Sequence, residues 1–365
     1  MKIALFGASG EIGGYLYQVL TKQGHTVTSY IRNSPGPILS RLVTRNCKLN
    51  DYSVSSLVTA LANIDVVVNA AIDKTPGLGA AKTIESNSNF VNNLLDAAEK
   101  VGVKKFVHFS SIVVLPPQLD DEVLQKSTPS SEKDWYTLAK KKTEQICLEH
   151  ATNSKMKIII LRPGIVYGAY MMWSRIAFRR LSETGISLPA KKSTCAAVHP
   201  VDIARLVGKI ITTKPVPQII YAINPEKISW FDYYQGHSVG TSEFSQHPVL
   251  INEKEPKTQG RLDILKIVAT EILIWIKDAP FWKYLVHLPF ILPAGSKVMT
   301  ALVYSKTIVN KPGDEPSYIP LDFERNLYLS HFNTHKIQTG KTIGFKYKIS
   351  FTTGVKSASL WWKGF

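Results

Sequence analysis

Short apolar runs of strand length alternate with amphipathic stretches through the first 165 residues of the chain. Five of the runs are rich in β-branched or aromatic residues, namely KIALF (2–6), TVTSYI (26–31), DVVVNA (65–70), KFVHF (105–109) and KIIIL (157–161). Their almost continuous apolar character is typical of strands that are buried on both faces of a sheet. A later run, QIIYAI (218–223), is a further candidate strand.

The stretches between these runs carry helical periodicity. From Ile12 to Leu20, apolar residues recur at i, i+4, i+7 and i+8, and Gly24 stands where such a helix would end. A second apolar stripe runs from Ile84 to Ala98 and is followed by Gly102. This alternation of strands and helices predicts an α/β fold with a doubly wound parallel sheet.

The periodicity weakens beyond about residue 225, where prolines recur at positions 280, 289, 293, 312, 316 and 320. We therefore expect two unequal parts. Residues 1–225 would form the sheet domain, and residues 226–365 would form a smaller, irregular C-terminal region.

The stretch ALFGASGEIGG (4–14) joins the first predicted strand to the first predicted helix, and its glycines follow a GxxGxxG pattern. A Rossmann-type dinucleotide-binding fold uses such glycines for a tight turn, for the close approach of a pyrophosphate, and for packing of helix against strand. The helix N-terminus attracts the same anion. The alternative is a glycine turn without a ligand. The expected cofactor contacts in this loop are Gly7, Ser9, Gly10, Glu11, Ile12 and Gly13.

The end of the second strand bears on the choice of cofactor. An acidic residue there would bind the ribose 2′-hydroxyl of NAD, but the sequence SYIRNS places Ile31 at that position and Arg32 after it. An arginine forms bidentate hydrogen bonds with a phosphate, so NADP(H) is favoured, with NAD(H) as the alternative. Arg32 could also be a surface residue without a ligand.

Two motifs carry candidate chemistry. DWYTLAKKK places Tyr136 and Lys140 four residues apart, on one face of a helix. A phenol is a poor acid–base group at neutral pH, and a nearby ammonium stabilises its ionised form. VHFSSIVVL ends the fourth predicted strand with Ser110 and Ser111, at the carboxyl edge of the sheet where ligands of such folds bind.

Taken together, the motifs resemble those of the extended short-chain dehydrogenase/reductase family, which includes the NAD-dependent epimerase/dehydratase group. The likeness runs from residue 1 to about 225 and resumes weakly in IGFKYKISFTTGVKSASLWW near the end of the chain. Besides the glycine loop, the serines and Tyr136-x-x-x-Lys140, it rests on NAA (69–71), LRPGIVYG (161–168) and VHPVDIA (198–204).

The resemblance implies roles for individual residues. Tyr136 would be the proton donor or acceptor at the carbinol oxygen. Lys140 would lower the pKa of Tyr136 and hold the nicotinamide ribose. Ser111 would hydrogen-bond the substrate oxygen, and Asn87 would support a proton relay through water. Further cofactor contacts would come from Asn69, Ala70, Ala71 and Pro163.

The sequence departs from the family pattern at two places. Lys48 stands where the family often has an Asp against the adenine, so a carboxylate contact with the adenine is not expected at this position. VLP replaces the usual VYG after the serines, which makes the substrate-facing loop unusual. A 4,6-dehydratase is disfavoured, because Ile112 and Val113 stand where such enzymes carry an Asp–Glu pair.

The resemblance and Arg32 together predict an NADP(H)-dependent oxidoreductase that interconverts a ketone and a secondary alcohol of a small-molecule substrate. One alternative is a nucleotide-sugar epimerase that retains NAD. Another is a non-catalytic nucleotide sensor or scaffold.

Two stretches bear on the substrate, which residues 226–365 would help to bind or cover. Arg175 and Arg179 lie four apart and could clamp a diphosphate or form a solvated basic face. The apolar stretch 264–293 could be packing, a substrate lid or a weak membrane-surface patch.

Composition narrows the remaining possibilities. The formal net charge is +16, but the basic residues are spread along the chain and no nucleic-acid-binding motif accompanies them. The chain has 3 cysteines, far apart and without CxxC spacing, so neither disulfides nor a metal site is expected. We read no secretory signal and no spanning helix, and expect a cytoplasmic protein.

Assembly is predicted from the helices expected at 84–100 and 136–150, through which relatives pair into dimers. Phe90, Leu94 and Ala97 lie beside the apolar stripe of this helix that we expect to pack on the sheet. They leave the helix with a surplus apolar face, which predicts a second packing partner. That partner would be a second copy or the C-terminal region folding back.

Overall fold

The structure, a computed structural model, describes residues 1–32, 38, 40, 46–49, 51–73, 80–115, 135–183, 186–188, 194–239, 249–251 and 338–363. A seven-stranded parallel sheet forms its centre, with strand order β10-β6-β5-β4-β1-β2-β3. The strands are β1 (Lys2–Phe6), β2 (Thr26–Ile31), β3 (Asn46–Lys48), β4 (Val66–Asn69), β5 (Lys105–Phe109), β6 (Lys157–Pro163) and β10 (Ile219–Ala222). The predicted doubly wound α/β fold is therefore confirmed.

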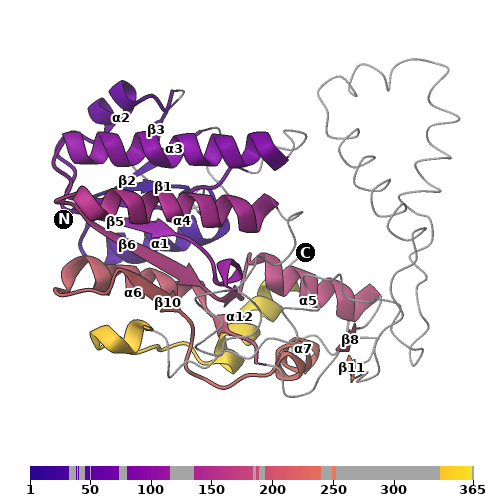
Figure 1. The fold of residues 1–365 in the computed structure, drawn as a ribbon. Coiled ribbons are helices and arrows are strands. Elements are labelled where there is room, and N and C mark those ends of the chain that lie inside the picture. Colours follow the sequence, from indigo (N-terminus) through magenta and orange to yellow (C-terminus); the bar gives the residue numbers. More distant parts are fainter. Residues whose placement is uncertain are drawn as a thin grey trace, which may run out of the picture.

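Helices cover both faces of the sheet. One face carries α1 (Glu11–Lys22) and α6 (Pro200–Thr212), and the other carries α2 (Val54–Ala60), α3 (Ala80–Lys100) and α4 (Trp135–Asn153). Figure 1 shows α3 and α4 lying side by side across the face nearest the viewer. Because the strands are parallel, their carboxyl ends all lie at one edge of the sheet. The loops that carry the sequence motifs begin at this edge.

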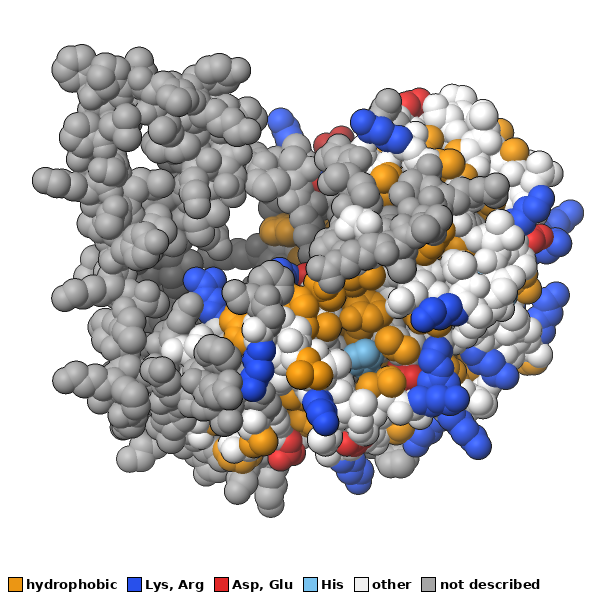
Figure 2. All heavy atoms as spheres, turned by 180° about the vertical axis from the view of Figure 1, so that it is seen from behind, with side chains coloured by type: hydrophobic (Ala, Val, Ile, Leu, Met, Phe, Trp, Pro, Cys, Tyr) orange, Lys and Arg blue, Asp and Glu red, His pale blue; other side chains and the backbone are white. Residues whose placement is uncertain are grey.

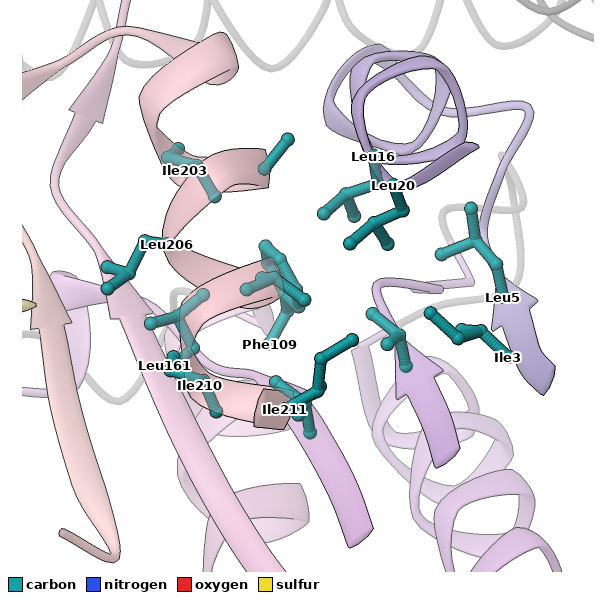
Figure 3. Close-up of a cluster of buried hydrophobic side chains, with 14 of the residues drawn as sticks. Ile3, Leu5, Leu16, Leu20, Phe109, Leu161, Ile203, Leu206, Ile210 and Ile211 are labelled. Carbon is teal, nitrogen blue, oxygen red and sulfur yellow. The ribbon is translucent and has the colours of Figure 1, made fainter. Parts of the chain in front are cut away.

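Alternation along each strand builds two separate apolar cores, because successive side chains point to opposite faces. Ile3 and Leu5 pack with α1 and α6, and Figure 3 shows them facing Leu16 and Leu20. Ala4 and Phe6 point the other way, into the core under α3 and α4. The nearly continuous apolar runs of the sequence follow from this double burial.

Smaller elements extend the carboxyl edge. They are η2 (Ile112–Val114), α5 (Met172–Glu183), α7 (Trp230–Val239), α12 (Phe351–Trp362), and the strand pairs β7 (Ile165–Val166) with β9 (Ala197–Val198) and β8 (Ile186–Leu188) with β11 (Val249–Ile251). A further short helix, η3 (Gly340–Ile343), packs against α6 and β10 instead. A third apolar core joins α5, α7 and α12 around Tyr167, Trp230, Tyr233 and Phe351.

The end of the chain returns to the sheet. Tyr221 of β10 forms a parallel bridge with Thr339, and Ile343 and Phe345 enter the core under α1 and α6. The fully buried carboxylate of Asp202, in α6, accepts the backbone N–H groups of residues 348 and 349 at 3.0 and 2.8 Å. These contacts fix the segment 338–349 against α6 and β10.

Three predicted strands have the observed bounds, namely β1, β2 and β5, and Gly24 and Gly102 have the positive φ angles of helix-ending glycines, +83° and +76°. The sequence did not predict β3 or α2, because a strand of 3 residues and a helix of 7 are too short to show periodicity. The apolar stretch 264–293 lies outside the described residues.

The surplus apolar face of α3 is covered inside the chain. Leu94 and Ala97 are fully buried, and the Phe90 ring contacts the rings of Phe6 and Tyr52. Among the described residues, the partner of this face is therefore the β2–α2 region of the same chain. The homodimer stays a prediction without this support.

The surface agrees with the dispersed charge of the sequence. On the face seen in Figure 2, Lys and Arg side chains are scattered, with Asp and Glu among them. Within the part of the chain that the structure describes, no helix is both long and apolar enough to span a bilayer.

Candidate active site

The glycine loop packs directly on the end of β4. Gly7 has φ +81°, and a Cβ atom on it would lie 2.5 Å from the backbone of Ala70 and Ala71. A Cβ on Gly13 would lie 2.0 Å from the carbonyl oxygen of Gly7, so α1 approaches the turn as only glycine permits. Gly10 is the N-cap of α1 and has no side chain to bond the amides of the first turn. An anion is the natural partner of those amides, so the loop fits a pyrophosphate.

Glu11, the first residue of α1, carries a charge that would oppose such an anion. Its carboxylate pairs with Arg175 of α5 and accepts the N–H of Met172 at 2.9 Å. Arg175 is thereby placed at the glycine loop, and Arg179 lies exposed on the same helix. The structure thus brings Arg175 to the glycine loop, where it neutralises Glu11.

The residues after β4 are fixed by amide side chains. Asn69 is fully buried, and its Oδ1 accepts the N–H of Ala71 at 3.1 Å. Asn87 of α3 accepts the N–H of Asp73 at 2.8 Å and donates to the carbonyls of Asp73 and Thr83 at 3.2 and 2.8 Å. Asn87 therefore holds the backbone of the loop that follows the NAA motif.

The end of β2 meets this loop. Arg32 Nη1 lies 3.2 Å from Asp73 Oδ1, and the other oxygen of Asp73 accepts the hydroxyl of Ser86 at 2.9 Å. Arg32 is half-exposed, with 53% of its side chain accessible, so solvent weakens the ion pair. Lys48, at the end of the neighbouring strand β3, is also exposed.

The two serines after β5 have different surroundings. Ser110 is buried and donates its hydroxyl to Glu144 of α4 at 2.5 Å. Ser111 caps η2, accepting the N–H of Val113 at 3.4 Å, so its own proton can be donated to a ligand. This difference leaves Ser111 as the candidate for contact with a substrate.

Tyr136 and Lys140 lie one turn apart on α4. Lys140 is buried, its Nζ donates to the carbonyl of Phe109 at 2.6 Å, and it lies 5.9 Å from the centroid of the Tyr136 ring. The helix also contacts η2, which begins after Ser111. A phenol, an ammonium and a hydroxyl are thus held near the carboxyl end of β5, a set that can transfer a proton to or from a ligand oxygen. Pro163 ends the adjacent strand β6.

An ion pair that the sequence analysis missed ties α4 to the sheet. The guanidinium of Arg162 donates hydrogen bonds to both carboxylate oxygens of Glu144, and 12% and 7% of the two side chains are accessible. Arg162 also donates to the hydroxyl of Tyr221. Burial alone would lower the pKa of Arg162, but the hydrogen bonds and charge of Glu144 raise it. No local pattern signals this pair, because Glu144 and Arg162 lie 18 residues apart in sequence, on a helix and on a strand.

Three buried imidazoles are neutral in the fold. Burial lowers the pKa of His108 to about 3, and those of His199 and His237 to about 4. A folded pKa below the unfolded value of ~6.5 means that the folded state binds fewer protons than the unfolded chain in this interval. Above pH ~6.5 these imidazoles are neutral in both states and cost the folded state nothing. As the pH falls towards 4, the unfolded chain takes up protons that the folded state does not, so the free energy of unfolding decreases.

We therefore expect urea unfolding to show a lower midpoint at pH 5 than at pH 7, with an upper limit of about 2 kcal/mol for each imidazole. His199→Asn keeps an N-cap acceptor for Val201 and removes one titrating group, so its midpoint should change less with pH. Equal pH dependence in the two proteins would contradict this assignment for His199.

A parallel sheet whose first strand leads through a glycine turn into a helix defines a Rossmann-type dinucleotide-binding enzyme fold. A family model, described as the NAD dependent epimerase/dehydratase family, matches residues 3–215. The chain belongs to this family and is an enzyme of the extended short-chain dehydrogenase/reductase type.

Two individual relatives are similar to parts of this chain. A UDP-glucose 4-epimerase of Vibrio cholerae is 27% identical over 267 residues, which cover 69% of this chain and 76% of the relative. A 3-beta-hydroxysteroid dehydrogenase of Mycolicibacterium neoaurum is 29% identical over 179 residues, 46% of this chain and 48% of that protein. The match to the dehydrogenase thus spans about half of its length.

The fold is also that of solved structures. The crystal structure of UDP-glucuronic acid 4-epimerase from Bacillus cereus, in complex with UDP-glucuronic acid and NAD, superposes with a TM-score of 0.60 at 19% identity. The alignment covers 100% of this chain and 99% of that one. At this identity, the likeness supports the fold.

Proposed function

We propose that the protein is an NADP(H)-dependent oxidoreductase that interconverts a ketone and a secondary alcohol, with Tyr136 as the acid–base group. The observation that carries the proposal is the position of Lys140. Its buried ammonium lies between the carbonyl of Phe109 and the ring of Tyr136, where it favours the ionised phenol.

The chain's own residues would act as follows. The glycine loop and the amides of α1 hold the pyrophosphate, and residues 69–71 and Pro163 complete the cofactor site. A bound nicotinamide supplies or accepts the hydride. Ser111 donates a hydrogen bond to the substrate oxygen, and Tyr136 gives that oxygen a proton in reduction or removes it in oxidation.

Reduction can be tested by following NADPH absorbance with a 3-ketosteroid as the carbonyl probe. This probe is chosen because the Mycolicibacterium relative is named as a hydroxysteroid dehydrogenase. Consumption of NADPH with formation of the alcohol supports the proposal. Absence of net turnover together with sugar epimerisation would contradict it.

The preference for NADP(H) rests on Arg32. No acidic residue ends β2, and the half-exposed guanidinium can exchange its weak pair with Asp73 for a phosphate. We expect Arg32→Met to weaken NADPH binding about 10-fold and to leave NADH binding within about twofold, because one charge-assisted contact is lost.

Asp73→Asn provides the matched variant. It removes the carboxylate that competes for Arg32, while the backbone contacts of residue 73 with Asn87 remain. NADPH affinity should rise a few-fold at low salt, measured by fluorescence titration of both cofactors. Equal changes for NADH and NADPH in either variant would contradict the assignment.

A second candidate is a nucleotide-sugar epimerase that retains NAD. It is favoured by the Vibrio relative, an epimerase whose match extends over 69% of this chain. Its test is conversion of UDP-glucose to UDP-galactose, with nicotinamide released when the purified protein is denatured. In the structure Arg175 is already engaged by Glu11, so a diphosphate would have to share or displace that pair.

We also propose that residues 1–225 bind the dinucleotide and carry Ser111, Tyr136 and Lys140, whereas residues 226–365 contribute to the substrate side. This division is supported by α7 and α12, which pack against α5 beyond the carboxyl edge of the sheet.

A further inference from the structure

Three consecutive residues at the end of β5 bond to the first half of α4. His108 Nε2 lies 3.2 Å from Thr143 Oγ1, the carbonyl of Phe109 accepts Lys140 Nζ, and Ser110 donates to Glu144. The side chains that this half of the helix buries are small or polar, and its first large apolar side chain that is fully buried is Ile146. Polar contacts therefore fix the part of α4 that carries Tyr136 and Lys140.

The contact through His108 continues to the loop that follows β4. Asn69 and His108 are register partners in the parallel pair β4–β5, and Asn69 Nδ2 lies 3.3 Å from His108 Nδ1. Asn69 Oδ1 in turn accepts the N–H of Ala71. One line of hydrogen bonds thus joins the backbone after β4 to α4 through two side chains of the sheet.

The direction of each hydrogen bond follows from these partners. Because Asn69 Oδ1 is used by Ala71, its amide nitrogen faces His108 and can only donate, so His108 Nδ1 accepts. The imidazole proton must then be on Nε2, from which it is donated to Thr143. The hydroxyl of Thr143 in turn donates a hydrogen bond to the carbonyl of Ala139 at 2.9 Å.

The environment keeps this imidazole neutral. His108 is 1% exposed, and burial together with the charge of Lys140 lowers its pKa to about 3. A cation would carry a proton on Nδ1, facing the amide protons of Asn69. A small cavity of about 10 Å³, lined in part by Ala71, His108, Lys140 and Thr143, shows that these groups surround one point of the site.

We propose that His108 and Thr143 are positioning residues that fix α4, and with it Tyr136 and Lys140, relative to the loop after β4 at Ala71. The proposal rests on the proposed function, because it assigns the purpose of the contact to placing the acid–base pair. Displacements near 1 Å at a reacting centre cost up to ~100-fold in rate, which is the scale on which such a contact acts.

The test uses the full chain and changes one methyl-sized group. Thr143→Val keeps the shape and removes the acceptor for His108. We expect its kcat with the 3-ketosteroid and NADPH to fall about 10–100-fold, with KM and the NADPH dissociation constant within about twofold. Thr143→Ser keeps the hydroxyl and should restore kcat. Thr152→Val, at an exposed threonine of α4 that bonds the carbonyl of Glu149, is the matched control.

A second measurement does not depend on turnover. In protein with ¹⁵N-labelled histidine, assigned with His108→Gln, the ring of His108 should carry its proton on Nε2 at pH 7, and Thr143→Val should shift that signal. A proton on Nδ1 overturns the proposal even if no probe is turned over. So does a kcat for Thr143→Val equal to that of Thr152→Val, or a loss that Thr143→Ser does not rescue. Normal kcat in Tyr136→Phe would instead overturn the proposed function.

Discussion

Replacing Tyr136 with Phe is expected to lower kcat by about 10²–10⁴-fold while the dissociation constant for NADPH stays within about twofold of wild type. The substitution removes one hydroxyl from a half-buried side chain and leaves the ring beside Lys140 in place. Proton transfer to the substrate oxygen then lacks its donor, whereas the glycine loop that binds the pyrophosphate is untouched. Steady-state kinetics and fluorescence titration measure the two effects separately.

Tyr30→Phe is the matched control. Tyr30 lies on β2, away from α4, and the substitution removes the hydroxyl that it donates to the carbonyl of Ala60. Its cost should appear as a loss of stability near 1 kcal/mol with kcat unchanged. An active Tyr136→Phe protein would refute the acid–base assignment.

Glu144→Gln is expected to lower the free energy of unfolding by about 3–5 kcal/mol, because it leaves the buried Arg162 guanidinium without a counter-charge. Ser110 also loses its carboxylate partner. Glu149→Gln, at an exposed acid on the same helix, should change stability by less than about 0.5 kcal/mol. Urea denaturation of the three proteins at one pH gives the comparison.

The double variant Glu144→Met/Arg162→Met separates pairing from packing. Replacing a whole buried ion pair by apolar residues of similar size is often neutral, so the double variant should regain most of the stability that Glu144→Gln loses. A single variant as stable as wild type would show that solvent reaches Arg162. A double variant no better than the single one would show that Arg162 is needed for its contact with Tyr221.

Local patterns in the sequence were sufficient for the frame of the molecule. Continuous apolar runs marked β1, β2 and β5 with their observed bounds, because strands buried on both faces need no polar side. The GxxGxxG spacing located the turn whose glycines pack on β4, and the order of the motifs identified the family, which the match over residues 3–215 confirms. These features depend on neighbours within a few residues, so the chain displays them directly.

Contacts between distant segments were decided only by the tertiary structure. The resemblance favoured Ser111 over Ser110, and only the fold supplies a physical difference between them, because Glu144, on a helix 34 residues away, accepts the hydroxyl of Ser110. It offered Arg32 and Arg175 as cations for phosphates, and the fold pairs them with Asp73 and Glu11. Each of these outcomes depends on which loops the parallel sheet brings to its carboxyl edge.

The same reason explains the surplus apolar face of α3 and the role of His108. Whether Leu94 needs a second copy of the chain to bury it depends on which residues α2 and Tyr52 cover. The sequence around α2 and Tyr52 shows no periodicity from which their positions could be predicted. His108 stands between apolar residues of β5, and its hydrogen-bond partners Asn69 and Thr143 lie 39 and 35 residues away in sequence. Sequence alone determined the strands and the order of the motifs, whereas the sheet register and helix packing decided which polar groups meet, because those contacts form between segments that local patterns do not relate.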